Sequence, residues 1–243
     1  MNSRRSKKSA AARLRPFWIL FAVLLAGALF AGYYGATWPG FRVRLVIIRG
    51  NRVVSRSEIL ARAAISGATN IWLQDPWAMR ERIQTIPYVG QVRVERKLPA
   101  EVLISVTERM PYALVGKTAP VLVDRALRVL ETHPKNARVP LFEVDAGIVR
   151  AGAFLRRPQI LAMRDDYGVL LAAHARIRTL RVDSMGELTA WMASGVAVRL
   201  GDDEALLQKV RLIEPILAQT QSRGKVIRVL DLRAPKTPVV VYR

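Results

Sequence analysis

The pattern of apolar and polar positions changes sharply after residue 16. Residues 17–38 read FWILFAVLLAGALFAGYYGATW and hold no charged side chain. A helix of that length is about 33 Å long, which is enough to cross the hydrocarbon core of a bilayer. Amphipathic rings prefer the headgroup zone, and the aromatic residues gather at the two ends of the run. They are Phe17, Trp18, Tyr33, Tyr34 and Trp38. We therefore predict a transmembrane helix over residues 17–38.

The segment in front of this run is basic and holds no acid. Its positive residues are Arg4, Arg5, Lys7, Lys8, Arg13 and Arg15. Positive charge beside the first apolar run favours keeping that end in the cytoplasm. We expect residues 1–15 to be disordered, as a basic topology signal or, as a weaker alternative, a docking peptide. Everything after Trp38 is then expected to face the other side of the membrane.

Two other interpretations of the apolar run are open. A cleaved signal peptide also has a basic start, an apolar middle and an Ala-x-Ala site, here Ala26-Gly27-Ala28. The apolar run continues ten residues past that site, however, which favours an anchor. A buried core helix is the weakest interpretation, because the run is apolar on every side.

After Pro39-Gly40 the pattern alternates between the periods of strands and helices. Ser55 and Glu58 fit a capping box, and Asp75-Pro76 is typical of a helix start. The expected elements are a strand over 41–49, a helix from Ser55 to near Gly67, a helix over 75–85, and strands over 89–96 and 101–109. The short link Lys97-Leu98-Pro99 predicts a hairpin. Since a sheet and helices bury their apolar faces by packing in layers, we expect a three-stranded sheet covered on one face by two helices.

The order of elements and the sequence motifs of this segment resemble the POTRA (polypeptide-transport-associated) domain of the FtsQ/DivIB family of bacterial cell-division proteins. The matching phrases are Ile48-Arg49-Gly50-Asn51, Val54-Ser55 through Glu58-Ile59, Asp75 with Ile83, Ile86-Pro87-Tyr88-Val89, Arg96-Lys97-Leu98-Pro99, and Val106-Thr107-Glu108-Arg109 before Pro111. Each phrase is common by itself. Their order behind a single anchor is what carries the resemblance.

The remainder of the chain predicts a β-rich domain with helices. We expect strands over 112–115, 120–124, 127–131 and 141–144, a helix over 156–173, strands over 177–183 and 188–200, a helix opened by Asp202-Asp203-Glu204 and running to about Gln221, and strands over 225–232 and 237–243. The three acids Asp202, Asp203 and Glu204 would then lie at the N-terminus of that last helix, where the helix dipole is positive. The predicted fold class is therefore α+β: a transmembrane helix, a POTRA-like domain of order β-α-α-β-β, and a β domain.

The family resemblance extends into this second half. The phrase Val121-Leu122-Val123-Asp124 is similar to the start of the family's second domain, although Arg125-Ala126 stands where the family has a glycine turn. Its C-terminal signature is matched by Val198-Arg199-Leu200-Gly201, by Lys209-Val210 with Ile213, and by Leu230-Asp231-Leu232-Arg233. The resemblance covers roughly residues 40–243.

The high positive charge of the chain is a reason to consider nucleic-acid binding. The net charge is +20, of which six positives lie in the tail, leaving 20 − 6 = 14 for the rest of the chain. These positives are scattered along predicted strands and loops rather than gathered in a block with aromatics, so we expect no nucleic-acid binding. A basic exported domain near anionic lipid accounts for them better. The absence of cysteine excludes disulfides and thiolate chemistry.

Candidate catalytic chemistry is sparse. His133 and His174 lie far apart and have no partner at metal-ligand spacing. Adjacent acids at Asp165-Asp166 and Asp202-Asp203-Glu204 are better explained as caps or solvated turns than as a general acid and base. We expect no catalytic residues, no cofactor, no metal site and no enzymatic activity.

Protein binding remains. Val239, Val240, Val241 and Tyr242 form a β-prone segment at the end of the chain, and a strand at a sheet edge can accept a partner strand. The alternative is an internal strand with both edges paired, and the residues alone leave the two open. The resemblance implies binding of FtsB, and with it FtsL, at this end, with Arg233 as a polar contact or merely part of the fold signature. The sheet edge around residues 41–48 is a second, looser candidate surface.

The prediction is a single-pass, type II inner-membrane protein. Its parts are a cytoplasmic tail over 1–16, the helix over 17–38, a POTRA-like domain over 39–110 and a β domain over 111–243. The resemblance implies a non-catalytic divisome scaffold that links early and late division proteins at midcell during septum formation, in contact with FtsB, FtsL and other divisome proteins. The alternatives are another POTRA-bearing subunit of envelope assembly or secretion, and a membrane-tethered periplasmic enzyme.

Overall fold

The fold is taken from a computed structural model that describes residues 10–67 and 70–243. Its first element is the apolar helix α1 (Ala10–Thr37), within which residues Pro16–Gly35 are long and apolar enough to cross a membrane and are not buried against protein. The predicted apolar helix is confirmed. The expected disorder of the tail is wrong for residues 10–15, which are helical; residues 1–9 lie outside the described residues.

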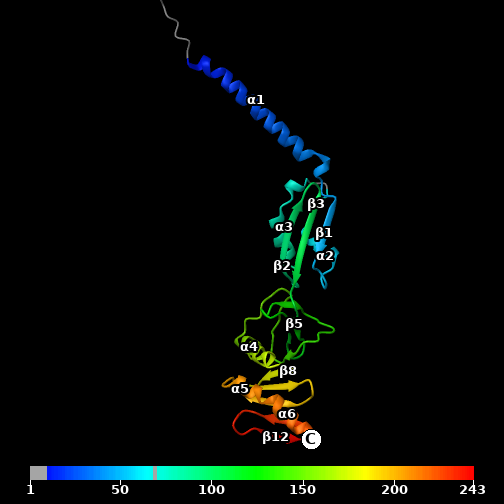
Figure 1. The fold of residues 1–243 in the computed structure, drawn as a ribbon, viewed down its shortest axis with the longest axis vertical. Coiled ribbons are helices and arrows are strands. Elements are labelled where there is room, and N and C mark those ends of the chain that lie inside the picture. The colour runs from blue at the N-terminus through cyan, green and yellow to red at the C-terminus, as the bar shows by residue number, and fades with distance from the viewer. Residues whose placement is uncertain (1–9, 68–69) are drawn as a thin grey trace, which may run out of the picture. The chain divides into compact units, whose positions relative to one another are not determined.

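The chain divides into two compact units, drawn in Figure 1, and α1 belongs to the first. The first holds residues up to 84 and 91–107, the second residues 85–90 and 108–243. In the first unit the elements after α1 are η1 (Pro39–Phe41), β1 (Leu45–Arg49), α2 (Arg56–Ala63), η2 (Ile71–Leu73), α3 (Pro76–Gln84), β2 (Val89–Lys97) and β3 (Glu101–Glu108). The sheet order is β1-β3-β2, with β1 parallel to β3. The predicted order of strands and helices is confirmed.

Local hydrogen bonds explain where these helices begin and end. The Ser55 hydroxyl accepts the Glu58 N–H at 3.1 Å, and Asp75 accepts the N–H groups of Trp77 and Ala78, so both predicted N-caps are present. The predicted end of the first helix near Gly67 is wrong. The chain leaves the helix at Ala64, which takes a left-handed φ of 51°.

The strand predicted over 41–49 begins only at Leu45. Pro39 fixes its own φ and lacks an N–H, and it starts the 3-10 turn η1. The Arg44 and Leu45 N–H groups both donate to the Ala100 carbonyl. Pairing with β3 therefore starts four residues later than alternation alone indicated.

The second unit contains one sheet of nine strands with three helices. The strands are β4 (Ala113–Val115), β5 (Val121–Val123), β6 (Val129–Glu131), β7 (Leu141–Phe142), β8 (Ile177–Val182), β9 (Leu188–Met192), β10 (Ala197–Gly201), β11 (Ile227–Asp231) and β12 (Val239–Tyr242); the helices are α4 (Pro158–Ala172), α5 (Leu206–Arg211) and α6 (Ile213–Ser222). The strand order is β12-β11-β10-β9-β8-β7-β4-β5-β6. The predicted α+β fold class is confirmed.

Two predictions for this unit are corrected. The single strand expected over 188–200 is two antiparallel strands, β9 and β10, which turn at Gly195 with φ of 87°. The turn contains Ser194-Gly195, a dipeptide typical of turns, which was the available signal in the sequence. Glycine is the residue that takes such a φ without strain.

The single helix expected from Asp202 to Gln221 is also wrong. Asp202 to Glu204 form a turn, Ala205 is left-handed, and α5 begins only at Leu206. The chain breaks again at Leu212 and restarts as α6. Pro215 has no N–H to donate to the preceding turn, so it fits in the first turn of a new helix and not in the interior of a long one.

The turn at Asp124 differs in sequence from the family pattern yet still forms. Asp124 accepts the Arg128 N–H at 2.8 Å and pairs with the Arg109 guanidinium at 2.7 Å. Leu127, at a φ of 61°, takes the left-handed conformation that a glycine would adopt easily. Its side chain is fully buried, which compensates the backbone strain.

The core of the second unit lies between the sheet and its helices. Residues that pair across five strands share one face and are buried or partly buried there: Leu180, Ala190, Val198, Leu230 and Val240. The helices contribute Ile160, Met163 and Leu170 from α4 and Val210 from α5. Side chains on alternate positions face away from this core.

Candidate partner-binding edge

The terminal strand β12 lies at one edge of the nine-stranded sheet. Among the residues that the structure describes it pairs only with β11, antiparallel, with Val240 opposite Leu230 and Val239 opposite Asp231. The four residues singled out in the sequence, Val239, Val240, Val241 and Tyr242, are the whole of this strand. The structure therefore favours the edge-strand alternative over the internal strand.

The directions of the backbone groups on β12 follow from one hydrogen bond. The Arg243 N–H donates to the Val226 carbonyl at 2.9 Å, so it points toward β11. Backbone groups of successive residues in a strand point in opposite directions. The N–H and C=O groups of Val239 and Val241 therefore face β11, and those of Val240 and Tyr242 face the open edge.

The other edge of the same sheet is covered. A loop runs along β6, where the Val129 N–H donates to the Ala153 carbonyl at 2.8 Å and the Gly152 N–H donates to the Val129 carbonyl at 2.7 Å. Among the described residues no such segment runs along β12. Proteins usually cover or blunt their sheet edges, so the contrast marks β12 as the edge kept available.

The side chains of β12 also differ from those of an ordinary surface strand. Val239 is 58% exposed, Val241 40% and Tyr242 43%. Tyr242 carries the Lys225 ammonium over its ring at 5.0 Å, while Val240 packs on the core. An exposed apolar edge strand is a known hazard for association with other chains.

The face of the sheet opposite the helices continues the apolar character of the edge. Paired residues form one row across five strands: Thr179, Trp191, Ala197, Val229 and Val241. The parallel row beside it is more polar: Arg181, Thr189, Arg199, Asp231 and Val239. Sequence periodicity did not reveal these rows, because they depend on strand order.

Arg233 is held by acidic residues of its own chain. Its guanidinium donates to both carboxylate oxygens of Asp231, at 2.8 Å to Oδ2 and 3.1 Å to Oδ1, and approaches Glu187 at 3.5 Å. These hydrogen bonds hold the pKa of Asp231 below its ordinary value. Arg233 lies in a small surface hollow that also includes Thr237 and Val239, so it is close to the start of β12.

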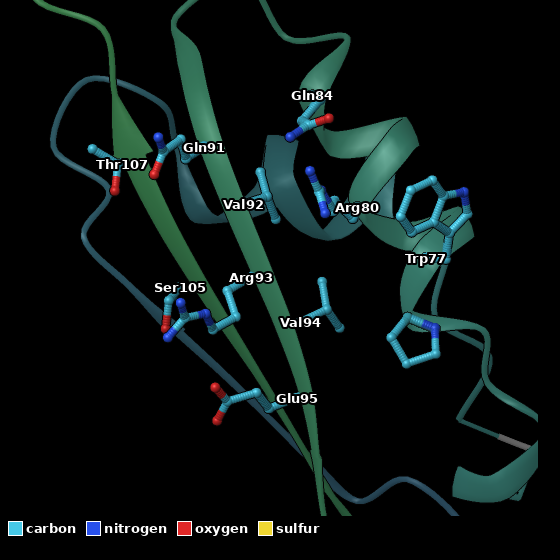
Figure 2. A pocket seen from close by; sticks show the side chains of 11 residues that line it. Trp77, Arg80, Gln84, Gln91, Val92, Arg93, Val94, Glu95, Ser105 and Thr107 are labelled. Atoms are coloured by element: carbon cyan, nitrogen blue, oxygen red, sulfur yellow. The ribbon is translucent and has the colours of Figure 1, made fainter.

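The first unit offers two further edges. On β1, predicted as the looser candidate surface, the outer carbonyl of Val46 already accepts the Arg56 guanidinium at 2.6 Å. On β2, sequence reasoning missed a groove of about 700 Å³ between that strand and α3, shown in Figure 2. Trp77 and Arg80 border it, with the guanidinium over the indole ring at 5.3 Å. Their spacing of three on α3 was the available signal.

The residues considered for catalysis remain scattered. Within the described ranges, 10–67 and 70–243, no three His, Cys, Asp or Glu side chains gather as they would around a metal. Asp166 in α4 is half-buried, and burial, followed by the nearby Asp203 and Asp165 carboxylates, raises its pKa to about 6. Asp202 instead pairs with the buried ammonium of Lys209 at 2.8 Å and shapes the turn before α5.

The comparison with known families agrees with this architecture. Residues 41–109 match the family model described as "POTRA domain, FtsQ-type". Residues 113–233 match the one described as "Cell division protein FtsQ/DivIB, C-terminal". With α1 in front, the fold defines a protein of the POTRA-bearing class that carries one apolar helix near its N-terminus, consistent with a single-pass membrane anchor.

Relatives support a more specific assignment. A cell division protein FtsQ of Syntrophotalea carbinolica is 27% identical over 227 residues, covering 90% of this chain and 80% of the relative. One of Streptomyces venezuelae is 29% identical over 245 residues, covering 96% and 86%. One of Mycobacterium tuberculosis is 26% identical over 227 residues, covering 91% and 67%. The chain belongs to the FtsQ/DivIB family of cell division proteins.

Proposed function

We propose that this cell division protein is a non-catalytic scaffold of the divisome, and that it binds FtsB, together with FtsL, by adding a partner strand to β12. The carrying observation is the open edge of the nine-stranded sheet, whose opposite edge is covered by its own chain. The scaffold role and the identity of the partners come from the family resemblance. The partner class, a β-strand with apolar side chains, comes from the edge itself.

The edge has a definite recognition pattern. A partner strand paired with β12 would receive two hydrogen-bonding positions from this chain, Val240 and Tyr242. On the face away from the helices, partner side chains would continue the row that ends at Val241, which favours an apolar residue there. Near Val239 they would meet Asp231 and Arg233, which favours a polar residue.

We also propose that the protein is a type II inner-membrane protein, with both units in the periplasm at the division septum. The basic residues before α1 support this orientation, since positive charge is retained on the cytoplasmic side. A scaffold in this position needs no chemistry of its own. It needs an anchor and an edge that stays open until the partner arrives.

The test is capture of FtsB by the full chain in detergent, comparing wild type, Val240→Pro and Val240→Ala. Proline at 240 removes a donor that faces the open edge and leaves the ladder to β11 intact. Alanine at 240 removes the same side-chain packing but keeps the donor. Strand addition predicts that proline reduces capture at least tenfold below alanine, because a backbone hydrogen bond is lost and the pyrrolidine ring blocks the edge.

Circular dichroism and retention on size exclusion are the folding controls for both variants. Equal capture by the proline and alanine variants would reject strand addition at β12. Loss of capture in both variants, with folding intact, would trace the loss to the packing of Val240 on the core and not to its N–H, and would likewise reject strand addition at that position. Hydrolysis of peptidoglycan by the purified chain would reject the scaffold role itself.

A further inference from the structure

The first unit carries an exposed apolar and basic patch beside the end of α1. The patch consists of Arg44, Trp72, Leu73, Arg96, Lys97 and Leu98, and is called the proximal patch below. Trp72 is 53% exposed, Leu73 66% and Leu98 54%. Three exposed large apolar side chains among three cations are uncommon on a surface that faces only water.

Hydrogen bonds hold η2 close to the end of the membrane-crossing stretch. The buried Asn70 side chain donates to the Gly35 carbonyl at 3.0 Å, and its Oδ1 accepts the Trp72 N–H at 2.9 Å. Gly35 is the last residue of the stretch that is long and apolar enough to cross a bilayer. Trp72 and Leu73 therefore lie close to the membrane surface when α1 spans the bilayer.

Aromatic rings continue this connection. Trp38 contacts Phe41 edge to face with centroids 4.9 Å apart, and Phe41 in turn approaches Trp72 at 6.3 Å. Tryptophan at the end of a membrane-spanning helix prefers the headgroup layer. These ring contacts connect the end of the helix to Trp72 in η2, which places η2 near the headgroup layer.

The β2–β3 hairpin completes the patch with charge. The Arg96 guanidinium donates to the Trp72 carbonyl at 3.1 Å, and the Arg44 N–H donates to the Ala100 carbonyl at 2.9 Å. Lys97 and Leu98 at the tip of the hairpin are both exposed. The nearby acid Asp75 uses its carboxylate to cap α3, and the three cations of the patch outnumber this one acid.

We propose that the proximal patch binds the anionic headgroups of the membrane in which α1 is anchored. Trp72, Leu73 and Leu98 enter the interfacial layer, and Arg44, Arg96 and Lys97 contact lipid phosphates. The first unit is then held at the membrane surface at two places, the helix and the patch. This inference rests on the proposed membrane anchoring of α1 and is independent of the partner bound at β12.

The chain contains no cysteine, so a single introduced cysteine can carry a fluorophore without background. The full chain is reconstituted in nanodiscs of phosphatidylcholine with phosphatidylglycerol, and NBD is attached at Leu73→Cys. Met185→Cys, which is 86% exposed in the second unit, is the matched water-facing control. Leu25→Cys within α1 reports whether the anchor itself is in the bilayer. Quenching by aqueous iodide is the measurement.

Iodide should quench the label at position 73 at least fivefold less than the label at 185. Replacing Arg44, Arg96 and Lys97 together by glutamine should abolish most of this protection, since each cation near an anionic surface changes binding about fivefold. Equal quenching at 73 and 185, with position 25 protected, would overturn the proposal. Protection unchanged by the triple substitution would overturn the assignment of anionic headgroups. Exposure of position 25 would instead mark a failure of the anchor.

Discussion

At the scale of single residues, several charged groups of this protein stabilise turns of the fold. Lys209, whose side chain is 3% exposed, donates to the carboxylate and the carbonyl of Asp202 and holds the turn before α5. Arg109 and Asp124 pair in the same manner beside the turn after β5. A buried charge that loses its partner is strongly destabilising, so these pairs account for the placement of the four residues.

Asp166 gives a pH prediction. Its pKa rises from the ordinary 3.8 to about 6 because burial and two nearby carboxylates disfavour the charged form. The folded state therefore holds the proton more tightly, and between about pH 4 and pH 6 stability falls as the pH rises. Asp166→Asn should stabilise the protein at pH 7 by about 1 to 2 kcal/mol, discounted for partial exposure.

Urea unfolding of wild type and Asp166→Asn in detergent, at pH 7 and at pH 3, checks this prediction. The gain should disappear at pH 3, where the carboxyl is protonated in both the folded and the unfolded state. A gain of the same size at both pH values would contradict the electrostatic cause.

Two glycines with the same φ give a matched comparison. Gly50 has φ of 85° and Gly186 has φ of 87°. A Cβ at Gly50 would overlap the Val106 carbonyl oxygen, whereas a Cβ at Gly186 would meet open space. Gly50→Ala should cost about 3 kcal/mol or more and Gly186→Ala about 1 kcal/mol. Thermal unfolding of the two variants should show the larger shift for Gly50→Ala, and equal shifts would refute the role of the close approach.

At the scale of elements, the backbone of strand β12 both pairs with β11 and presents hydrogen-bonding groups at the open edge. Alternate residues either hold the strand to β11 or face the open edge. A substitution that removes an N–H therefore has opposite consequences at neighbouring positions.

Val241→Pro removes a donor that faces β11 and should release β12 from the sheet, whereas Val240→Pro should leave it in place. Hydrogen exchange of the β11 amides checks this difference. Exchange should become at least tenfold faster in Val241→Pro than in Val240→Pro, since a lost ladder bond exposes its neighbours. Equal exchange in the two variants would show that the assigned amide directions are wrong.

At the scale of the whole molecule, the proposed function depends on orientation. The anchor is expected to leave residues before α1 in the cytoplasm and both units on the other side. A membrane-impermeant maleimide should label Met185→Cys but not Ser3→Cys in cells whose outer barrier is permeable. Labelling of both positions in intact spheroplasts would contradict the type II orientation. A mature chain that begins near Leu29 would show cleavage instead of anchoring.

Local chemistry explains why much of the fold was predictable. The apolar helix, the caps at Ser55 and Asp75 and the alternation of β2 and β3 all depend on residues close in sequence. Predictions failed where a break was short and the apolar pattern resumed directly after it. Gly195 between β9 and β10, and Leu212 between α5 and α6, interrupt segments whose periodicity runs on.

The sequence by itself determined the type and order of most helices and strands, the apolar stretch over Pro16–Gly35, and the β-prone character of Val239 to Tyr242. It also carried the resemblance to the FtsQ/DivIB family. Those properties follow from side-chain periodicity and local hydrogen bonds, which act within a few residues.

Only the tertiary structure decided which strands have free edges and which side chains share a surface. The sequence of Val239 to Tyr242 would look the same for an internal strand as for an edge strand. The segment that covers β6, residues 152–155, begins more than 20 residues after β6 ends. The proximal patch likewise depends on contacts between residues distant in sequence, Asn70 with Gly35 and Arg96 with Trp72. Strand order and long-range hydrogen bonds create these surfaces, and neither is encoded in local periodicity.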